Sequence, residues 1–418
     1  MLDIQYIKDN TKQVKDSLST RKINPETIDE LINLHDKWTE KLNSWEKLRQ
    51  KRNEIAHGGK FSEEGKSLKE ELVKVELELQ NAKKEYDKIA YEIPNIPLKD
   101  VPKGIDPKVI KEGNPTKFNF KPKDHVELGT DLNIIDVQRA AKVSGSRFAY
   151  LKNEGALLEF AIVQFVMENL VKEGFSPIIP PALVRKEITY DLGYWHGGGN
   201  ENYYLVHDVA LEGPEKGTEL PLYLIGTGEH AVVPMHMNEI FGDDELPKKY
   251  AAFSPCFRRE AGAAGKDTKG ILRVHQFDKI EMVQFVKPED DEKQRRKMLA
   301  IAENLTSSLG LPYQVVVLGS EDLGFPSAET IDIETWIPSQ EAFRETHSIS
   351  TTTDFQARRL KIRYRKGKTT ELVHILNGTA FAIGRTLIAI MENYQQKDGS
   401  IQIPKALQKY AGFTKIPK

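Results

Sequence analysis

The stretch Phe257–Glu281 reads FRREAGAAGKDTKGILRVHQFDKIE and predicts two strands that flank a loop of small residues. Residues two apart on a strand share one face of a sheet. Arg258 and Glu260 therefore share a face of the first strand. Unpaired charges are costly in a hydrophobic core, so this surface suits a charged ligand that contains a ring; the alternative is a solvent-exposed ribbon with surface ion pairs. The second strand carries on one face Arg273, His275, Phe277, Lys279 and Glu281.

Composition indicates a folded protein of two or three domains. The chain has 418 residues, of which 39% are hydrophobic and 29% charged, enough for a sizeable core. No apolar run approaches the roughly 20 residues of a membrane helix, and the first residues do not resemble a secretory signal. The single cysteine, Cys256, excludes an internal disulfide and a Cys-rich zinc site. We therefore expect a cytoplasmic protein without zinc and without membrane association.

Charge and motifs restrict how this chain could bind a nucleotide. The net charge of −2 does not indicate a nucleic-acid binder, so any RNA contact must come from local patches. The nearest match to a P-loop, Gly262–Asp267, is short between its glycines and has Asp in place of Ser or Thr. No G-x-G-x-x-G opens a helix. A nucleotide would therefore have to be bound by side chains on a sheet.

Residues 25–92 predict two long helices that fold back on each other. Heptad-like spacing in each helix, with a break at His57–Lys60, is typical of an antiparallel coiled coil. At ~1.5 Å per residue each helix would be about 45 Å long, without a globular core of its own, and would project as an arm. The alternative is a dimerisation or spacer coil. The expected seam comprises Leu31, Leu34, Trp38, Trp45, Leu48 and Ile55 on the first helix, and Leu68, Leu72, Val75, Leu79, Ala82, Tyr86 and Ile89 on the second.

The quoted stretch resembles motif 2 of the class II aminoacyl-tRNA synthetases, in the form found in seryl-tRNA synthetases (F-R-x-E-A-G, G-x-D-T, R-x-H-Q-F and a final glutamate). The predicted helix at Glu154–Glu173 and the following strand with Pro181 resemble motif 1, and Asn377–Gly399 resembles motif 3. The resemblance implies an α+β fold with an antiparallel-sheet class II catalytic domain over residues 106–418. Residues 1–105 would form the N-terminal antiparallel two-helix coiled-coil arm and a linker, and motif 1 would form a homodimer interface.

The resemblance implies that ATP and Mg²⁺ bind at motifs 2 and 3. The catalytic pair would be Arg258, on the α-phosphate and the amino-acid carboxylate, and Arg385, on the γ-phosphate. A guanidinium fork suits such oxyanions, and a helix start adds to anion binding. Mg²⁺ would bind with ATP through Glu345 and Ser348. The implied ATP-binding residues are Arg258, Arg259, Glu260, Val274, Phe277, Glu345, Thr346, His347, Ser348 and Arg385.

The resemblance implies separate roles for Glu260, Phe277 and His347 within this set. Glu260 would accept from the adenine amino group while Phe277 stacks on the ring. His347 departs from the small residue usual in the family, and we interpret it as a variant residue behind the site rather than a new base. Upstream, Asp332 and Glu334 alternate on a predicted strand and could add charge behind the metal site.

The serine pocket is likewise implied by resemblance. Thr227-Gly228-Glu229 stands where the seryl enzymes have T-x-E, and we expect its outer residues on one face of a strand. Glu281 would meet the substrate ammonium; its alternative is an ion pair with Lys279 or Arg273. Thr379 would sense the serine hydroxyl. The region Tyr194–Val206 differs from the family pattern. The implied serine-binding residues are Thr227, Gly228, Glu229, Arg258, Glu281, Asn377 and Thr379.

These features favour a serine–tRNA ligase that forms seryl-adenylate from serine and ATP and transfers serine to the 3′ end of tRNA(Ser). Whether tRNA(Sec) is also charged stays open. In the family the arm grips the long variable arm of the tRNA, and Lys51, Arg52 and Lys60 are the local candidates here. One alternative is a ligase that loads a carrier protein, although such relatives lack the arm. Another is an inactive paralogue acting as an RNA-binding regulator, against which stand Arg258 and Arg385.

Overall fold

The computed structural model describes residues 1–57, 63–196, 199–207, 216–217, 221–261 and 269–418. The predicted turn at residues 58–60, including Lys60, therefore lies outside the described residues, as do residues 262–268 of motif 2. The chain divides into two compact units, Met1–Pro97 and Leu98–Lys418. Among the described residues no helix is long and apolar enough to cross a membrane.

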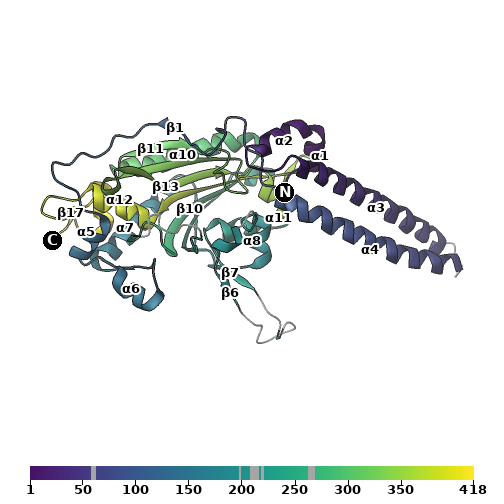
Figure 1. The fold of residues 1–418 in the computed structure, drawn as a ribbon, viewed down its shortest axis with the longest axis horizontal. Helices are drawn as coiled ribbons and strands as arrows, with labels where there is room; N and C mark the ends of the chain where they lie inside the picture. The colour runs from purple at the N-terminus through teal and green to yellow at the C-terminus, as the bar shows by residue number, and fades with distance from the viewer. Residues whose placement is uncertain (58–62, 197–198, 208–215, 218–220, 262–268) are drawn as a thin grey trace. The chain divides into compact units, whose positions relative to one another are not determined.

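The first unit is built on two long antiparallel helices, α3 (Glu26–His57) and α4 (Glu63–Glu92), preceded by α1 (Ile4–Asp9) and α2 (Thr11–Ser19) (Figure 1). All thirteen predicted seam residues are buried or half-buried, so the predicted coiled-coil pairing is confirmed. Trp38 stacks on Tyr86 with ring centroids 5.5 Å apart, and Lys41 pairs with Glu78 at 2.7 Å. These contacts fix which residues of the two helices face each other.

The prediction that the two-helix hairpin has no globular core of its own is wrong at the end of the hairpin where α1 and α2 pack against it. Asp3 caps α1 by accepting from the Gln5 backbone N–H at 2.8 Å, and the two short helices then pack against the hairpin. Amphipathic segments as short as α1 and α2 give weak periodicity, and their stability comes from this packing rather than from helix propensity. The buried core residues are Ile7, Val14, Leu18, Ile28, Leu31, Tyr86, Ala90 and Ile93.

The second unit is organised by one eight-stranded sheet in the order β1-β11-β12-β13-β16-β10-β9-β4. Neighbouring strands are antiparallel except β4 and β9, which are parallel. The predicted antiparallel sheet is therefore confirmed. The strands are β1 (Lys108–Lys111), β4 (Ser176–Ile178), β9 (Lys248–Phe257), β10 (Gln276–Val286), β11 (Tyr313–Val317), β12 (Glu329–Ile337), β13 (Ala342–Thr351) and β16 (His374–Ala382).

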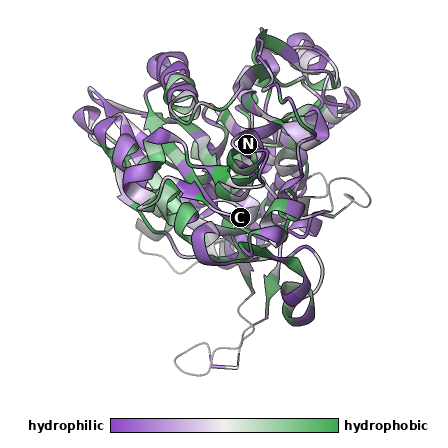
Figure 2. Cartoon of the chain, turned by 90° about the vertical axis from the view of Figure 1, so that its left-hand side faces the viewer, coloured by the Kyte–Doolittle hydropathy of each residue, from purple (hydrophilic) through white to green (hydrophobic). Residues whose placement is uncertain are grey.

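Helices cover the two faces of this sheet unequally. The helices α7 (Asn153–Lys172), α10 (Asp291–Ser308) and α12 (Ile383–Asn393) pack on one face through a single large core. A smaller core with α8 (Lys186–Leu192), α9 (Glu229–Val232) and α11 (Phe355–Leu360) covers part of the other face. Apolar residues concentrate in the central strands and polar residues on peripheral helices and loops (Figure 2). The rest of the second face is left for polar side chains.

Smaller elements complete the second unit and lie around the main sheet. They include a three-stranded sheet of β5, β7 and β6 and a second of β15, β14 and β8. Their bounds are α5 (His125–Asp131), α6 (Val137–Ser144), α13 (Lys405–Ala411), β2 (Ile135–Asp136), β3 (Tyr150–Leu151), β5 (Leu183–Arg185), β6 (Leu205–Val206), β7 (Leu222–Leu224), β8 (Ile240–Phe241), β14 (Arg363–Lys366), β15 (Thr369–Leu372), β17 (Ile401–Gln402) and β18 (Lys415–Ile416).

The motif 1 region leaves apolar side chains on the surface of this unit. The helix α7 lies within one residue of its predicted bounds. The predicted strand after it is split into β4 and β5, because Pro180 and Pro181 cannot donate to a ladder. On α7, Leu157 and Phe160 are 52% and 69% exposed, and Ile179 beyond β4 is 80% exposed.

Candidate active site

The motif 2 hairpin is shorter than the sequence predicts. The strand β9 ends at Phe257 and β10 begins at Gln276, so the predicted strand positions of Arg258, Glu260 and Arg273 are wrong. One further backbone bond, from the Arg258 N–H to the His275 carbonyl at 3.0 Å, extends the pairing. Glu260 has φ +51°, a left-handed conformation that strands exclude. The chain therefore turns at Glu260 instead of continuing flat.

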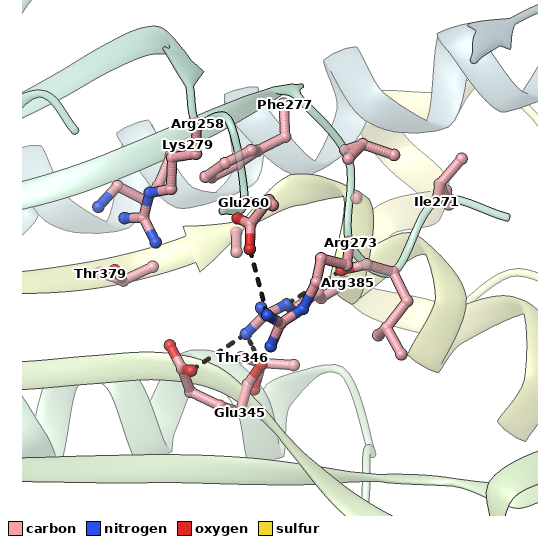
Figure 3. Close-up of a pocket in the computed structure, with 14 residues that line it drawn as sticks. Arg258, Glu260, Ile271, Arg273, Phe277, Lys279, Glu345, Thr346, Thr379 and Arg385 are labelled. Atoms are coloured by element: carbon pink, nitrogen blue, oxygen red, sulfur yellow. Dashed lines mark hydrogen bonds and ion pairs between the residues drawn. The ribbon is translucent and has the colours of Figure 1, made fainter. Parts of the chain in front are cut away.

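The three charged side chains nevertheless converge on one pocket over the sheet (Figure 3). Arg273 donates to the Glu260 carboxylate at 3.2 Å, so a bent backbone replaces the flat strand face in bringing them together. The pocket is lined by residues of motifs 2 and 3 and of β13: Arg258, Glu260, Ile271, Leu272, Arg273, Val274, Phe277, Lys279, Glu345, Thr346, Thr379, Ala382, Gly384 and Arg385.

Two β-bulges help to set which side chains face this pocket. The register of β10 and β16 shifts between Ile280 and Glu281, which leaves Ala380 as an extra residue. The shift between Ile333 and Glu334 in the β12–β13 pair makes Thr346 an extra residue in the same way. An extra residue reverses the alternation of faces beyond it. Consequently Thr379 and Ala382, three residues apart, both line the pocket.

The two arginines of the predicted catalytic pair reach the pocket from different elements. Arg258 follows β9; its Nε donates to the Gly226 carbonyl at 3.1 Å, and its guanidinium lies 5.4 Å from the Phe277 ring centroid. Arg385 is the third residue of α12. The strand before this helix was expected to end near Asn377, but β16 continues to Ala382. Hydrogen bonds to backbone carbonyls hold both arginine side chains in place, and both guanidinium groups line the pocket.

Arg385 also controls the charge of the nearest carboxylate. Its Nη1 donates to the Glu345 backbone carbonyl at 2.7 Å and pairs with Glu345 Oε2 at 3.2 Å. Burial alone would raise the pKa of Glu345, but the charges of Arg385 and Arg258 outweigh it and hold that pKa below its usual value. Glu345 is thus an anion beside the pocket, as a metal ligand must be.

Oxygen donors behind Glu345 fit the implied Mg²⁺. Burial and the charge of Glu345 raise the pKa of Asp332 well above its usual value, and the Ser348 side chain donates a hydrogen bond to it. One Asp332 oxygen, Oδ1, is buried without a partner among the described residues. The described residues contain no group of three acidic or imidazole side chains that could hold a metal unaided. This set fits Mg²⁺, which usually binds one or two carboxylates together with substrate phosphates.

His347 points away from this set. Its ring is fully buried, tilted against Phe381 at a centroid distance of 4.7 Å, and lies within 3.3 Å of the Thr306 hydroxyl on α10. Burial lowers the pKa of His347 to about 3, so the ring is neutral. Any contact of His347 with ATP would have to come from its backbone. Arg259 is absent from the pocket lining given above, and its backbone N–H donates to the Asn202 carbonyl at 2.8 Å.

The predicted strand at Thr227–Glu229 is wrong, since these residues form a bend that enters α9 at Glu229. Glu229 is buried at the start of α9, where Tyr194 Oη donates to one carboxylate oxygen at 2.6 Å and Gln356 Nε2 to the other at 2.8 Å. Burial raises the pKa of Glu229 to about 7, although both hydrogen bonds oppose the rise. Glu229 therefore lacks a full countercharge.

Gly228 lies in close contact with the neighbouring strands. A Cβ at this position would lie 3.1 Å from the Ala252 Cβ and 3.4 Å from the Glu281 Cβ. The alanine usual in the family would thus require a small shift of β9 here. The departure from the family is therefore one of packing.

The remaining residues predicted for the serine pocket meet on β10 and β16. Thr379 pairs with Glu281 in register, and its hydroxyl donates to Glu281 Oε2 at 3.4 Å. Lys279 forms an ion pair with Glu281, which is the alternative that the sequence left open. Asn377 is buried, and its Nδ2 has no hydrogen-bond partner among the described residues. An unused buried donor beside these groups is suited to a polar ligand.

Several residues that shape this site carry no recognisable signal in the sequence. Tyr194 and Gln356 come from segments without a local motif, so only the fold brings them to Glu229. His125 is buried with its Nδ1 3.1 Å from Glu392 Oε1, and its Nε2 accepts from the Ile271 backbone N–H at 3.2 Å. It thereby ties the pocket-lining end of motif 2 to α12. The alternation of β10 does place Lys279 on the pocket face.

Two family models match the chain. The model for the seryl-tRNA synthetase N-terminal domain matches residues 1–97, and the model for the class II tRNA synthetase core domain (G, H, P, S and T) matches residues 214–394. The chain is 40% identical over 436 residues to the serine–tRNA ligase of Thermodesulfovibrio yellowstonii, with 100% of both chains covered. It is 41% identical to that of Dictyoglomus turgidum, with 100% of this chain and 99% of the relative covered.

Solved structures agree with this result. A seryl-tRNA synthetase from Pyrococcus horikoshii, complexed with ATP, has a TM-score of 0.89 and 37% identity, and covers 100% of this chain and 99% of its own. A cytoplasmic serine–tRNA ligase from Naegleria fowleri, in complex with AMP, has a TM-score of 0.86 and 30% identity with the same coverage. The resemblance seen in the sequence is confirmed over its full length. The chain belongs to the seryl-tRNA synthetase family of class II aminoacyl-tRNA synthetases.

Proposed function

We propose that this chain is a serine–tRNA ligase that activates L-serine with ATP and transfers the seryl group to tRNA(Ser). The observation that carries the proposal is the single pocket in which Arg258, Arg385 and Lys279 meet Glu345 and Thr379. The similarity to serine–tRNA ligases over the whole chain, arm included, favours this function over a carrier-protein ligase. The presence of Arg258 and Arg385 in the pocket favours an active enzyme over an inactive RNA-binding paralogue.

Activation requires little proton transfer. The serine carboxylate attacks the α-phosphorus in line. A bond forms between a carboxylate oxygen and the α-phosphorus, the bond from the α-phosphorus to the oxygen that bridges it to the β-phosphorus breaks, and pyrophosphate leaves with that oxygen and the electron pair. Positioning and charge stabilisation carry such a reaction. In the proposal Arg258 holds the α-phosphate and Arg385 the γ-phosphate, while Glu260 and Phe277 hold the adenine. A ribose hydroxyl oxygen of the terminal tRNA adenosine then forms an ester bond to the seryl carbonyl carbon, the bond from that carbon to the phosphate oxygen breaks, and AMP leaves while the hydroxyl proton is released.

The proposed ATP is bound with Mg²⁺. Glu345 and Ser348 would hold the ion, with Asp332 behind them, and the ion would neutralise charge on the phosphates when bound. The ATP complex of the Pyrococcus horikoshii relative supports ATP as the nucleotide. Zinc has no part in the proposal.

Serine recognition falls to the buried groups around Glu281. The ammonium would lie between Glu281 and Glu229, and the hydroxyl would reach Thr379 and Asn377. A site built to hydrogen-bond a hydroxyl rejects analogues that lack it, because its buried polar groups are then left unpaired. The unpartnered Asn377 Nδ2 supports this assignment.

The proposed partners bind outside the pocket. Residues 1–105 would bind tRNA through the coiled-coil arm, and residues 106–418 would form the catalytic domain. A homodimer would cover the exposed apolar side chains of α7 and of Ile179. We place the enzyme in the cytoplasm, where the absence of disulfide-forming cysteine pairs would cost nothing. A solved seryl-tRNA synthetase bound to tRNA(Sec) shares 18% identity with this chain and therefore supports only its fold.

ATP–pyrophosphate exchange, assayed with each amino acid in turn, tests the proposed reaction. We expect exchange with serine, and a fall of about 100-fold in its rate for Arg385→Ala, on the order of the loss when one charge-stabilising donor is removed. The control is Arg139→Ala, whose side chain is 73% exposed. Exchange with alanine or glycine and none with serine would overturn the proposal and favour the carrier-protein ligase.

The arm is tested by a truncation that keeps the base of the hairpin. Lys41 and Glu78 face each other, so residues 42–77 can be replaced by a short Gly/Ser linker without touching the core around Tyr86. We expect serine-dependent exchange to persist and aminoacylation of tRNA(Ser) to be lost. Aminoacylation at the full rate would exclude the arm as a tRNA-binding element, and loss of exchange would show that the arm serves the catalytic domain structurally.

The raised pKa of Glu229, about 7, predicts how serine binding depends on pH. The ionised fraction of Glu229 rises from roughly a tenth at pH 6 to roughly nine tenths at pH 8, and an ammonium binds the ionised form. The apparent Kd for serine should therefore fall roughly tenfold over this range. Isothermal titration calorimetry measures it, and Glu229→Gln should bind serine weakly with a flat profile. A wild-type Kd that rises with pH would contradict this role of Glu229.

The proposed homodimer predicts that a charge on the exposed face of α7 separates the protomers. Phe160→Glu should give a monomer in analytical ultracentrifugation, since an unpaired charge would have to be buried in the interface. The matched control is Val73→Glu on α4, where Val73 is 62% exposed. If Phe160→Glu remains as associated as the wild type, the interface lies elsewhere.

A further inference from the structure

A buried lysine occupies the place that the proposed function assigns to the substrate ammonium. Lys279 and Glu281 are 5% and 3% exposed. The Lys279 ammonium donates to Thr227 Oγ1 at 2.8 Å and forms an ion pair with Glu281. Glu281 is one of the two carboxylates assigned to the ammonium of serine, and Thr227 belongs to the implied serine-binding residues. A primary ammonium with three donors is common to both cations, so one can stand in for the other.

Lys279 balances the charge of Glu281, so a ligand that displaces the lysine must supply a cation in its place. A buried carboxylate without a cation is strongly unfavourable, and Lys279 supplies that cation to Glu281. Serine brings an ammonium and a carboxylate together. If its ammonium takes Glu281, the displaced Lys279 needs a new anion, and the serine carboxylate is one. Lys279 and Arg258 line the same pocket and lie beside each other in Figure 3, so a turn of the flexible lysine stem would reach the anion that Arg258 is proposed to hold.

We propose that serine binds by dividing the Lys279–Glu281 ion pair: its ammonium replaces the lysine on Glu281 and Thr227, and its carboxylate receives Lys279. This proposal rests on the proposed function and deepens it. Lys279 and Glu281 each keep a charged partner throughout the exchange. A ligand with an ammonium but no carboxylate breaks the ion pair without giving Lys279 a new partner. Lys279 is thus a specificity-determining residue that requires a carboxylate on any amine before chemistry begins.

Two ligands separate this role from a structural one. Serinol carries the ammonium and hydroxyl of serine without its carboxylate. Isothermal titration calorimetry on the full chain, without ATP, gives the ratio of the serinol Kd to the serine Kd. We expect Lys279→Met to lower this ratio at least tenfold, because serinol no longer competes with the lysine and serine loses its carboxylate partner. Lys279→Arg should keep the ratio near the wild-type value.

The matched control is Lys287→Met. Lys287 lies just past β10 and pairs with Asp243 at 2.6 Å, away from the pocket, so its loss should leave the ratio unchanged. An equal ratio in Lys279→Met and the wild type overturns the inference, and so does weaker serinol binding with unchanged serine binding. A wild type that catalyses serine-dependent exchange while giving these results leaves the proposed function intact.

A crystal of the wild-type chain with serine gives a second readout that does not depend on whether Lys279→Met folds. The expected structure has the serine ammonium on Glu281 and the Lys279 Nζ on the serine carboxylate. A Lys279 Nζ that stays on Glu281 and Thr227 with serine bound overturns the inference.

Discussion

The site depends on one antiparallel sheet that must bury one face completely and keep charges on the other. The helices α7, α10 and α12 fill the first face with a continuous apolar core, which fixes the strands rigidly. On the second face Phe277, Lys279 and Glu281 follow one another at every second residue of β10. Rigid strands hold the backbone of these residues in place, so the sheet does not have to reorganise when a ligand binds, as charge stabilisation requires.

The two β-bulges adapt this regular sheet to an irregular ligand. Without the extra residue at Ala380, strict alternation could not bring both Thr379 and Ala382 to the pocket. The extra residue at Thr346 likewise lets neighbouring residues, Glu345 and Thr346, line it together. Both bulges lie in strands that contribute to the pocket.

The sequence predicted the long and periodic parts of the fold well. The coiled-coil seam from Leu31 to Ile89 and the helix α7 follow from their spacing, because burial imposes that period over many residues. The ends of the motif 2 strands were predicted too far into the loop, since alternation cannot reveal a turn such as that at Glu260. The short helices α1 and α2 were missed, because packing rather than local periodicity stabilises them.

Charged residues of the pocket were found through motifs, whereas their supporting contacts were not. Arg258, Glu260 and Arg385 stand in recognisable patterns, and the structure brings them to one pocket. Tyr194 and Gln356 hold Glu229 from segments far apart in sequence, so their role emerges only from the fold. His347 is the opposite case. Its neighbours in the sequence suggested a contact with ATP, but its position on β13 places the ring in the core beside α10.

The most direct test of this active site is a crystal structure with a non-hydrolysable seryl-adenylate analogue. The account predicts the adenine against Phe277 and Glu260 and the α-phosphate mimic on Arg258. An analogue bound elsewhere, with Arg258 still donating to Gly226 and Arg385 still donating to Glu345 and Leu272, would contradict it.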